Sequence, residues 1–395
     1  MTQHPKTSWG AVFAMSLAAF VLVASEFMPV SLLTPIAADL HVTEGQAGQG
    51  IAVSGLFALI TSLLIASIAA RVERKPLLLS LTLLMIVSGT VAAFAPNYTT
   101  YMLARALIGI AIGGFWSLSA ATAMRLVPED QVTRAMAIVN GGNALATVIA
   151  APLGSFVGSL IGWRGAFFCI VPVAVLAAAW LMVSMPTLKN SGAANSGNVF
   201  RLMERLPVAL GMIAVSVFFM GQFMLFTYLR PFLETVTQVS VSTLSLMLLV
   251  LGLAGLAGTF LIEAFLKSGL HRTLIVIPLL MAVIAVALVS FGSSAITTTV
   301  LLGLWGLVAT AAPVGWWTWL ARTLPDDAEA GGGLMVAIVQ LAIASGATVG
   351  GLLFDFSGYR ATFESSAMLL GLAAALAWLA ARSASREANG VTNLA

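Results

Sequence analysis

Apolar segments of about 20 residues alternate with short polar stretches along the whole chain. A helix of about 20 apolar residues is long enough to cross the hydrocarbon core of a bilayer. We therefore predict twelve spanning helices, at roughly 9–38, 46–70, 76–95, 100–124, 131–158, 165–185, 207–233, 241–266, 273–292, 296–321, 330–355 and 361–382. Because the loops between these segments are short, neighbouring helices should run antiparallel.

The composition agrees with a membrane protein. Hydrophobic residues make up 60% of the 395 residues and charged residues only 8%, and the mean hydropathy is +1.03. A soluble globular chain carries about 25% charged residues. No polar stretch is long enough for a separate soluble domain, so the expected fold class is an all-α integral membrane protein.

Positively charged residues crowd one side of the predicted membrane. If the N-terminus is cytoplasmic, fourteen of the eighteen Lys and Arg residues fall in cytoplasmic segments. Arg164, Arg230 and Arg360 fall outside, and Arg105 lies within the fourth span. Cytoplasmic loops carry an excess of Lys and Arg, so we predict that both termini are cytoplasmic.

The two halves of the chain are similar to each other at an offset of 196 or 197 residues. The matches are EFM at 26–28 with Pro35 against QFM at 222–224 with Pro231, RLVPED at 125–130 against RTLPDD at 322–327, and GWR at 162–164 with Phe167 against GYR at 358–360 with Phe363. Three matches at nearly one offset indicate the duplication of a six-helix unit.

The one polar linker of any length, KNSGAANSGNVFRLMER, falls between these halves. We predict an N-terminal six-helix bundle at 1–188, a cytoplasmic linker at 189–205, a C-terminal six-helix bundle at 206–382 and a cytoplasmic tail at 383–395. Two such bundles are typical of a secondary transporter whose site lies between the halves near the midplane of the bilayer. A structural or assembly protein of the membrane is the alternative.

Several motifs resemble the major facilitator superfamily, a family of two-bundle secondary transporters. The loop ASIAARVERK at 66–75 is similar to the superfamily's signature between its second and third helices. It keeps Arg71, Arg74 and Lys75, to which the resemblance assigns a part in gating. At 66, 70 and 73 it has alanine, alanine and glutamate where glycine, aspartate and glycine are usual, so a gating salt bridge through that aspartate is not expected.

Longer motifs resemble the drug:proton antiporter group, and most of all the bacterial purine ribonucleoside efflux pumps and the sugar efflux transporters. These motifs are EFMPVSLLTPIAADL, GGFWSLSAATAMRLVP, APLGSFVGSLIGWR, FTYLRP and PVGWWTWLARTL. The resemblance covers nearly the whole chain. It implies the major facilitator fold of two pseudo-symmetric six-helix bundles, export of a small molecule and coupling to protons.

Glu26 is the one charged residue in the run from Ala11 to Ala38. Burial in hydrocarbon penalises the ionised form of a carboxyl group, so this residue is suited to take up and release a proton. A permanently protonated or salt-bridged structural residue is the alternative. The counterpart in the second half, Gln222, cannot ionise, so only the first copy is titratable.

Arg105 is the other charge deep in a span. Its segment, RALIGIAIGG, resembles the superfamily's fourth-helix motif, whose arginine is implicated in proton handling. Because arginine stays protonated, we expect it to bias a nearby carboxylate or backbone group rather than to carry the proton. Packing alone is the alternative, since Gly109, Gly113 and Trp116 continue the same helix face.

The fifth span carries a stripe of small or polar residues, Asn143, Thr147, Ala151 and Ser155, at a spacing of four. The stripe resembles the antiporter motif of exporters, which Pro152 fits best, and we assign Pro152 to conformational change on that basis. Close helix packing is the alternative for the stripe.

Amides and aromatic residues are the candidates for substrate binding. Asn143 and Gln340 occupy matched places in the two halves, and Gln222 is a third amide within a span. The aromatic candidates are Phe115, Trp116, Phe226, Tyr228, Trp316 and Trp317. Taken singly, each ring is better explained as a packing or interfacial residue. Together with the amides, the rings suit a flat, neutral, hydrogen-bonding solute. Arg230, near the outer end of the seventh span, is a candidate gate or topological anchor.

Enzyme activity is not expected. No Gly-x-x-x-x-Gly-Lys-Ser/Thr loop for phosphate occurs. His4, His41 and His271 lie at or beyond the ends of spans, too scattered for a metal site, and we expect no cofactor.

The sequence therefore predicts a proton-coupled exporter of small neutral metabolites, most like purine ribonucleosides, in a bacterial inner membrane. Its partners would be the solute, protons and the lipid bilayer; we expect a monomer and no nucleic acid. A sugar or multidrug efflux antiporter and an uncoupled facilitator are the alternatives. Glu26 favours antiport, because a facilitator needs no titratable group in its first span.

Overall fold

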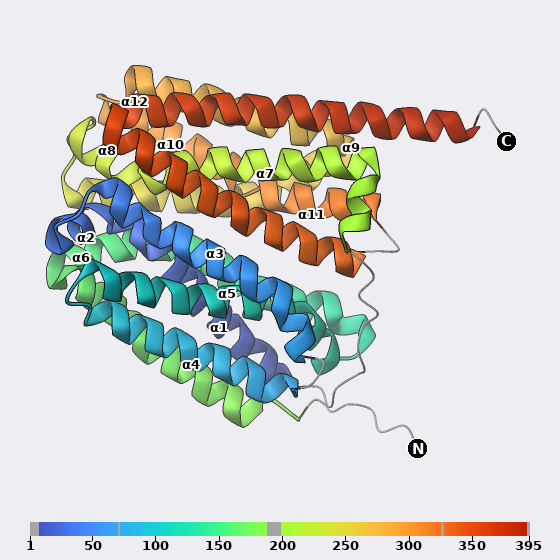
Figure 1. Cartoon of the computed structure of the whole chain (residues 1–395), viewed down its shortest axis with the longest axis horizontal. Coiled ribbons are helices and arrows are strands. Elements are labelled where there is room, and N and C mark those ends of the chain that lie inside the picture. The colour runs from blue at the N-terminus through green and yellow to red at the C-terminus, as the bar shows by residue number, and fades with distance from the viewer. Residues whose placement is uncertain (1–7, 70–71, 188–198, 325–327, 393–395) are drawn as a thin grey trace. The chain divides into compact units, whose positions relative to one another are not determined.

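The computed structural model describes residues 8–69, 72–187, 199–324 and 328–392, and these form helices and short connections without a strand (Figure 1). Contacts between residues divide the chain into two compact units, 1–194 with 241–245, and 195–240 with 246–395. The predicted gating residue Arg71 and residues 189–198 of the predicted linker lie outside the described residues.

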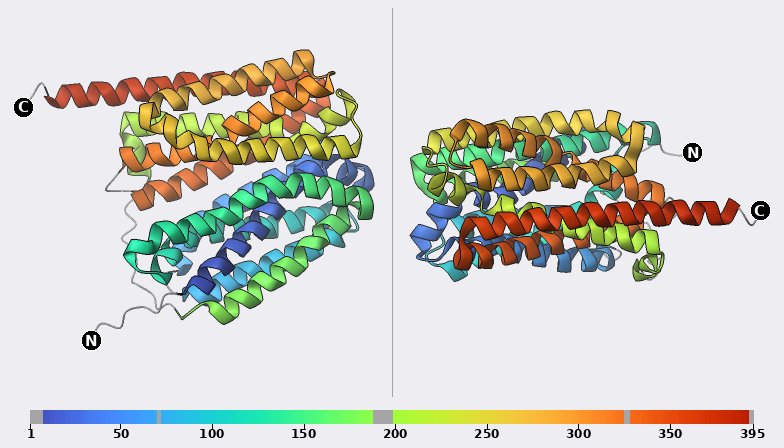
Figure 2. Two further views of the ribbon diagram at one scale, coloured as in Figure 1. Left: turned by 180° about the vertical axis from the view of Figure 1, so that it is seen from behind. Right: turned by 90° about the horizontal axis from the view of Figure 1, so that it is seen from above.

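The first unit is built from six helices. They are α1 (Trp9–Ser31), α2 (Leu33–Leu40), α3 (Glu44–Ala69), α4 (Arg74–Ala93), α5 (Tyr98–Leu126) and α6 (Val132–Ser184), with a short 3-10 turn at Glu129–Gln131. α1 and α2 together make the first span. α6 is interrupted at Gly162, whose backbone leaves the helical region (φ 77°, ψ 163°). That conformation is accessible to glycine almost alone. The views in Figure 2 show the helices of this unit running back and forth beside one another.

The second unit repeats this plan. Its helices are α7 (Leu206–Thr227), α8 (Leu229–Thr235), α9 (Val241–Phe291), α10 (Ala295–Ala309), α11 (Ala312–Thr323) and α12 (Ala328–Thr392), preceded by a 3-10 turn at Val199–Glu204. α9 is interrupted at Gly269 and α12 at Gly358. The predicted tail from 383 onward continues α12 as far as Thr392.

The helices account for twelve membrane spans. Within the described residues, nine helical segments are long and apolar enough to cross a bilayer, and three of them contain 51, 51 and 54 residues. At 1.5 Å per residue a 51-residue helix would extend about 77 Å, more than twice the thickness of about 30 Å that it has to cross. Each of the three is broken by its glycine into two spans, so the predicted twelve-helix fold is confirmed.

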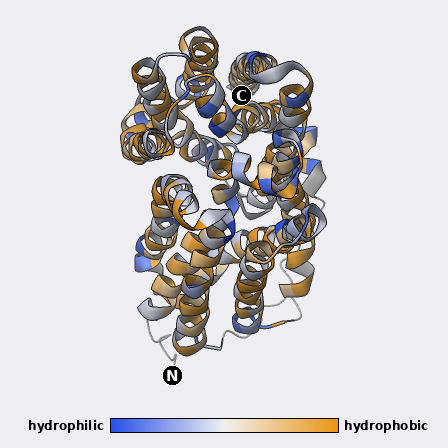
Figure 3. Ribbon diagram, turned by 90° about the vertical axis from the view of Figure 1, so that its left-hand side faces the viewer, coloured by the Kyte–Doolittle hydropathy of each residue, from blue (hydrophilic) through white to orange (hydrophobic). Residues whose placement is uncertain are grey.

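Apolar residues dominate the helices along their length (Figure 3). Large apolar side chains also point outward from both units; Val183 in the first unit is 84% exposed and Phe356 in the second is 85% exposed. On a soluble protein such a surface would drive association. Here it is the surface that lipid covers.

The internal repeat is present in the geometry of the two units. Gly162 and Gly358 share φ 77° at an offset of 196. A Cβ atom built on Gly109 would lie 2.3 Å from the Ser54 carbonyl oxygen, and one built on Gly306 would lie 2.1 Å from that of Leu251, at an offset of 197 in both partners. The same backbone-to-backbone contact therefore holds α3 against α5 and α9 against α10.

α1 packs closely along the first part of α6. The Ser16 hydroxyl donates a hydrogen bond of 2.7 Å to the Ile138 carbonyl. Gly154 lies against Met28 and Ser31, and Gly158 against Leu32. The glycines of α6 thus hold α1 in place, and with it the segment that contains Glu26.

Candidate functional site

Arg105 lies on α5, 2% exposed, and reaches two other helices of the first unit. Its guanidinium group donates hydrogen bonds to four oxygen atoms. The acceptors are the carbonyl oxygens of Ser25 (2.8 Å), Gly50 (3.0 Å) and Glu26 (3.4 Å) and the Ser54 hydroxyl (3.1 Å). A buried arginine is tolerated when its donors are satisfied in this way. We call Arg105, Ser25, Glu26, Gly50 and Ser54 the arginine node.

Pro29 explains why α1 has a carbonyl oxygen to offer to Arg105. Proline lacks a backbone N–H, so the carbonyl of the residue four positions earlier loses its helical donor. Pro29 lies inside α1, and that residue is Ser25. The shortest hydrogen bond of Arg105 goes to this oxygen. The sequence of α1 thus frees a carbonyl oxygen within the membrane, and α5 supplies the donor for it.

Glu26 is the acidic residue of the node and is 7% exposed. Its backbone carbonyl accepts a hydrogen bond of 3.4 Å from Arg105, so the residue that carries this carboxyl group lies next to the guanidinium. The structure therefore brings together the two intramembrane charges that the sequence singled out separately. A fixed cation beside a buried carboxyl group favours the charged form, whereas burial favours the neutral form.

Two of the predicted amides of the second unit have an unsatisfied oxygen. The Oε1 atoms of Gln222 on α7 and Gln340 on α12 are buried and have no hydrogen-bond partner among the described residues, and Gln340 is 6% exposed as a whole. Leaving a buried acceptor unpaired costs about 1–3 kcal/mol. In the first unit, Asn143 on α6 is half-buried. The two glutamine oxygens therefore suit a ligand that donates hydrogen bonds.

The predicted aromatic residues differ in their surroundings. Tyr228 is fully buried; its hydroxyl donates to the Ala347 carbonyl (2.7 Å) and its ring stacks on Phe354 at 5.3 Å. Phe115 is also fully buried and meets Trp116 edge to face, while Trp316 is buried between Phe218 and Trp319. Trp116 is partly buried, Phe226 lies against Phe223, and Trp317 is 45% exposed. In this structure the rings of Phe115, Tyr228 and Trp316 contact neighbouring side chains, and a substrate role for any of the six stays a prediction.

The predicted gating residues are spread over both units. Arg74 and Lys75 are half-buried at the start of α4, and Pro152 is buried in the first part of α6. Arg230 is 6% exposed, and its Nε atom donates to Glu234 one turn further along α8 at 2.8 Å. Sequence reasoning left out Glu234, although its spacing of four residues signals an ion pair on a helix.

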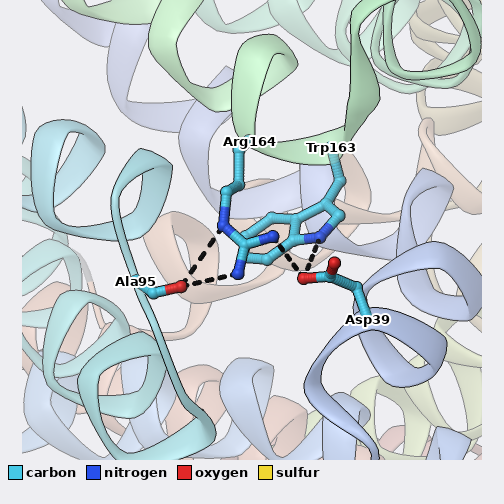
Figure 4. A network of polar contacts seen from close by, with 4 residues as sticks. All are labelled: Asp39, Ala95, Trp163 and Arg164. Atoms are coloured by element: carbon cyan, nitrogen blue, oxygen red, sulfur yellow. Dashed lines mark hydrogen bonds and ion pairs between the residues drawn. The ribbon is translucent and has the colours of Figure 1, made fainter.

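A second polar cluster was missed by the sequence analysis (Figure 4). The Asp39 carboxylate on α2 accepts hydrogen bonds from the Trp163 indole, at 3.1 Å, and from the Arg164 guanidinium, both of which follow the break in α6. Arg164 also donates two bonds to the Ala95 carbonyl after α4, at 2.7 and 3.2 Å. This cluster fastens three segments at one end of the first unit. Among the described residues, no three His, Cys, Asp or Glu side chains lie close enough to hold a metal ion.

Comparison with known proteins settles the family. The sequence model of the Major Facilitator Superfamily matches residues 15–334. The chain belongs to the Major Facilitator Superfamily. It is therefore a membrane transporter and not an enzyme, as the sequence predicted.

Its relatives in this superfamily differ in what their names say. The transcription regulatory protein OpdE of Pseudomonas aeruginosa PAO1 is 61% identical over 95% of this chain and 94% of that protein. The purine ribonucleoside efflux pump NepI of Shigella sonnei is 40% identical over 94% of each chain, and that of Escherichia coli K12 is 39% identical with the same coverage.

Solved structures of transporters share the fold. A bacterial homologue of the human lysosomal transporter Spinster, in an inward-facing and occupied conformation, superimposes with a TM-score of 0.78 at 16% identity, over 96% of this chain and 98% of that chain. The D-xylose-proton symporter superimposes with a TM-score of 0.73 at 17% identity, over 94% and 96%. At these identities the match concerns the fold alone.

Proposed function

We propose that this member of the Major Facilitator Superfamily is a proton-coupled exporter of small neutral metabolites, with purine ribonucleosides as its main substrates. The observation that carries the coupling is the hydrogen bond of 3.4 Å from Arg105 to the backbone carbonyl of the buried Glu26, in a unit whose repeat has the neutral Gln222 instead. Relatives named purine ribonucleoside efflux pumps, 40% identical over nearly the full length, support the substrate class and the direction of transport.

In this proposal Glu26 carries the proton and Arg105 stays charged throughout. Protonated, Glu26 is a neutral residue in an apolar helix; deprotonated, its carboxylate is stabilised by the adjacent guanidinium. One proton moving across 100 mV supplies about 2.3 kcal/mol, and one pH unit adds about 1.4 kcal/mol. Together they sustain a gradient of roughly a few hundred-fold for a neutral solute, so one proton per solute is enough for useful export.

The amides and aromatic rings support the substrate class. Gln222 and Gln340 offer acceptor oxygens that the described residues leave unsatisfied, and the hydroxyl and amino groups of a ribonucleoside are hydrogen-bond donors. We assign Asn143, Gln222 and Gln340 to hydrogen bonding with the substrate. Trp116, Phe226 and Trp317 are our stacking candidates, because aromatic faces bind flat heterocycles.

A relative that is named a transcription regulatory protein raises a second possibility, direct regulation of transcription. Binding to DNA needs a strongly basic surface, and only 8% of this chain is charged. For this chain we propose that any effect on transcription follows from the concentration of the solute that it exports. The coupling variant Glu26→Gln separates the two cases, because a direct effect through DNA would survive it.

We place the chain in a bacterial inner membrane with both termini cytoplasmic, because fourteen of its eighteen Lys and Arg residues then fall on the cytoplasmic side. A phosphatase or fluorescent reporter fused after Ala395 is expected to give the cytoplasmic signal. A second reporter in the 189–205 linker should agree with it. An external signal at either position would contradict this orientation.

The central experiment is a substrate panel with the purified chain in liposomes. With an imposed pH gradient, labelled purine ribonucleosides are expected to accumulate against their concentration gradient, whereas sugars and cationic drugs should accumulate much less. A protonophore should abolish the accumulation and leave exchange of labelled for unlabelled solute intact. Preference for a sugar or a drug would contradict the proposed substrate class. Accumulation that does not depend on the pH gradient would contradict the proposed proton coupling.

The same liposomes test the amides. Gln340→Ala and Asn143→Ala should weaken ribonucleoside binding about five-fold or more, the effect of losing one hydrogen bond to a ligand in a buried site. Any loss of thermal stability without substrate in Gln340→Ala should come from lost packing and not from a lost hydrogen bond to Oε1, because that oxygen has no partner among the described residues. Asn140→Ala is the control, since that exposed amide donates its hydrogen bond to the Met136 carbonyl of its own helix. Unchanged affinity in both test variants would show that these amides serve packing and do not bind the substrate.

A further inference from the structure

The second unit has an equivalent position for each residue of the arginine node, so the two sets of residues can be compared. Pro29, three residues after Glu26, corresponds to Leu225, three residues after Gln222. The contact of Gly109 with Ser54 in the first unit matches that of Gly306 with Leu251 in the second, at an offset of 197 residues. Ser54 therefore corresponds to Leu251, and at the same offset Arg105 corresponds to Leu302. All three polar or helix-breaking positions of the first unit are thus leucine in the second.

The leucines pack without difficulty. Leu225 and Leu302 are fully buried and Leu251 is 8% exposed. The six-helix unit therefore closes with an apolar group at each of these positions. Burying an arginine in the membrane is costly and has to be compensated by acceptors. The first unit carries this cost although the fold has an apolar solution, which indicates that the node serves function rather than packing.

We propose that Pro29 and Ser54 are positioning residues of the proton-coupling site, which hold the Arg105 guanidinium against the backbone of α1 next to Glu26. Pro29 acts by leaving the Ser25 carbonyl without its helical donor, so that Arg105 Nη1 bonds it at 2.8 Å. Ser54 acts through its hydroxyl, which accepts from Nη2 at 3.1 Å. This inference rests on the proposed proton coupling through Glu26.

Pro29 and Ser54 determine the orientation of the Arg105 guanidinium as well as its position. The same Nη2 atom that bonds Ser54 also reaches the Glu26 carbonyl, at 3.4 Å, so the hydroxyl orients the end of the guanidinium that faces Glu26. A cation held in this way favours the ionised carboxyl group more than a mobile one does. Within the described residues, the titratable groups acting on Arg105 are Glu26 and Tyr101, and Tyr101 is in turn influenced by Tyr98.

The test uses Pro29→Ala, which restores the N–H that competes for the Ser25 carbonyl, and Ser54→Ala, which removes the fourth acceptor. In liposomes, uphill accumulation should fall about ten-fold for Pro29→Ala, as expected for one lost hydrogen bond to a charged group. The pH at which accumulation is half-maximal should rise in both variants, because Glu26 then keeps its proton to a higher pH. Exchange of labelled for unlabelled ribonucleoside, which needs no net proton movement, should stay close to that of the wild-type protein.

Two controls separate positioning from packing. Ser54→Thr keeps the hydroxyl and should keep the wild-type pH profile. Pro35→Ala removes another proline of the same span, one that is matched by Pro231 in the second unit; it should leave the pH profile unchanged. A shift of the profile in Pro35→Ala equal to that in Pro29→Ala would overturn the inference.

The triple variant Pro29→Leu/Ser54→Leu/Arg105→Leu copies the second unit into the first. It is expected to fold, to exchange ribonucleoside and to show no pH-driven accumulation. A triple variant that fails to fold would show that the first unit needs the node for packing and would overturn the inference. Wild-type pH profiles in Pro29→Ala and Ser54→Ala would overturn it as well, provided that Glu26→Gln abolishes accumulation. Undiminished accumulation in Glu26→Gln would instead contradict the proposed proton coupling through Glu26.

Discussion

Replacing Glu26 by glutamine is expected to abolish pH-driven accumulation and to leave a folded protein that still binds its substrate. Glutamine has the shape and the hydrogen-bonding groups of the protonated acid but cannot lose a proton. The second unit has Gln222 at the matching place in α7, so an amide is compatible with the packing there. The step that depends on deprotonation should be missing, whereas exchange of labelled for unlabelled solute needs no such step.

The measurement is ribonucleoside accumulation by purified protein in liposomes, with the interior and exterior pH set independently. Wild-type substrate affinity should vary with pH, and this dependence should flatten in Glu26→Gln. Glu263→Gln is the matched control, because its carboxylate is exposed and paired with Lys267 one turn away. Full accumulation against a gradient by Glu26→Gln would mean that this carboxyl group is structural and that protons move elsewhere.

The sequence predicted the features that depend on local pattern. Apolar segments gave the spans, and isolated charges within them pointed to Glu26 and Arg105. The pattern could not show that these two residues meet, because their contact depends on how α1, α3 and α5 pack against one another. The role of Pro29 was equally hidden, since a proline inside a helix reveals a free carbonyl oxygen only when its new donor is known.

Other parts of the site were beyond sequence reasoning for different reasons. Asp39 lies at the end of a span, where a charged residue is ordinary, so nothing marked it as the partner of Arg164. Tyr228 was grouped with the substrate-binding rings, yet its hydroxyl bonds the Ala347 carbonyl within the second unit. In a membrane helix, apolar residues occupy both the packed and the lipid-facing sides, so hydropathy alone does not indicate which way an aromatic ring points.

The close contact between α1 and α6 predicts a second large effect, a loss of stability when Gly142 is replaced by alanine. A Cβ atom on Gly142 would lie 1.9 Å from the Ser16 carbonyl oxygen and 2.8 Å from its carbonyl carbon. No side-chain rotation relieves a clash with backbone, so α1 would have to move away from α6. Such movement also loosens the neighbouring bond from the Ser16 hydroxyl to Ile138. Overpacking of a well-packed interface costs about 1–3 kcal/mol and sometimes more, so we expect Gly142→Ala to lower the melting temperature strongly or to prevent folding.

The adjacent residue provides the control. A Cβ atom on Gly141 would meet no atom within 4 Å, and alanine is favoured over glycine inside a helix by up to about 1 kcal/mol. Gly141→Ala should therefore be neutral or stabilising, whereas the same change one residue later should be strongly destabilising. Thermal unfolding and size-exclusion chromatography of the detergent-purified variants measure both. Because α1 carries Glu26, a Gly142→Ala protein that still folds should also lose pH-driven accumulation, and equal melting temperatures for the two variants would contradict the close packing of α1 on α6.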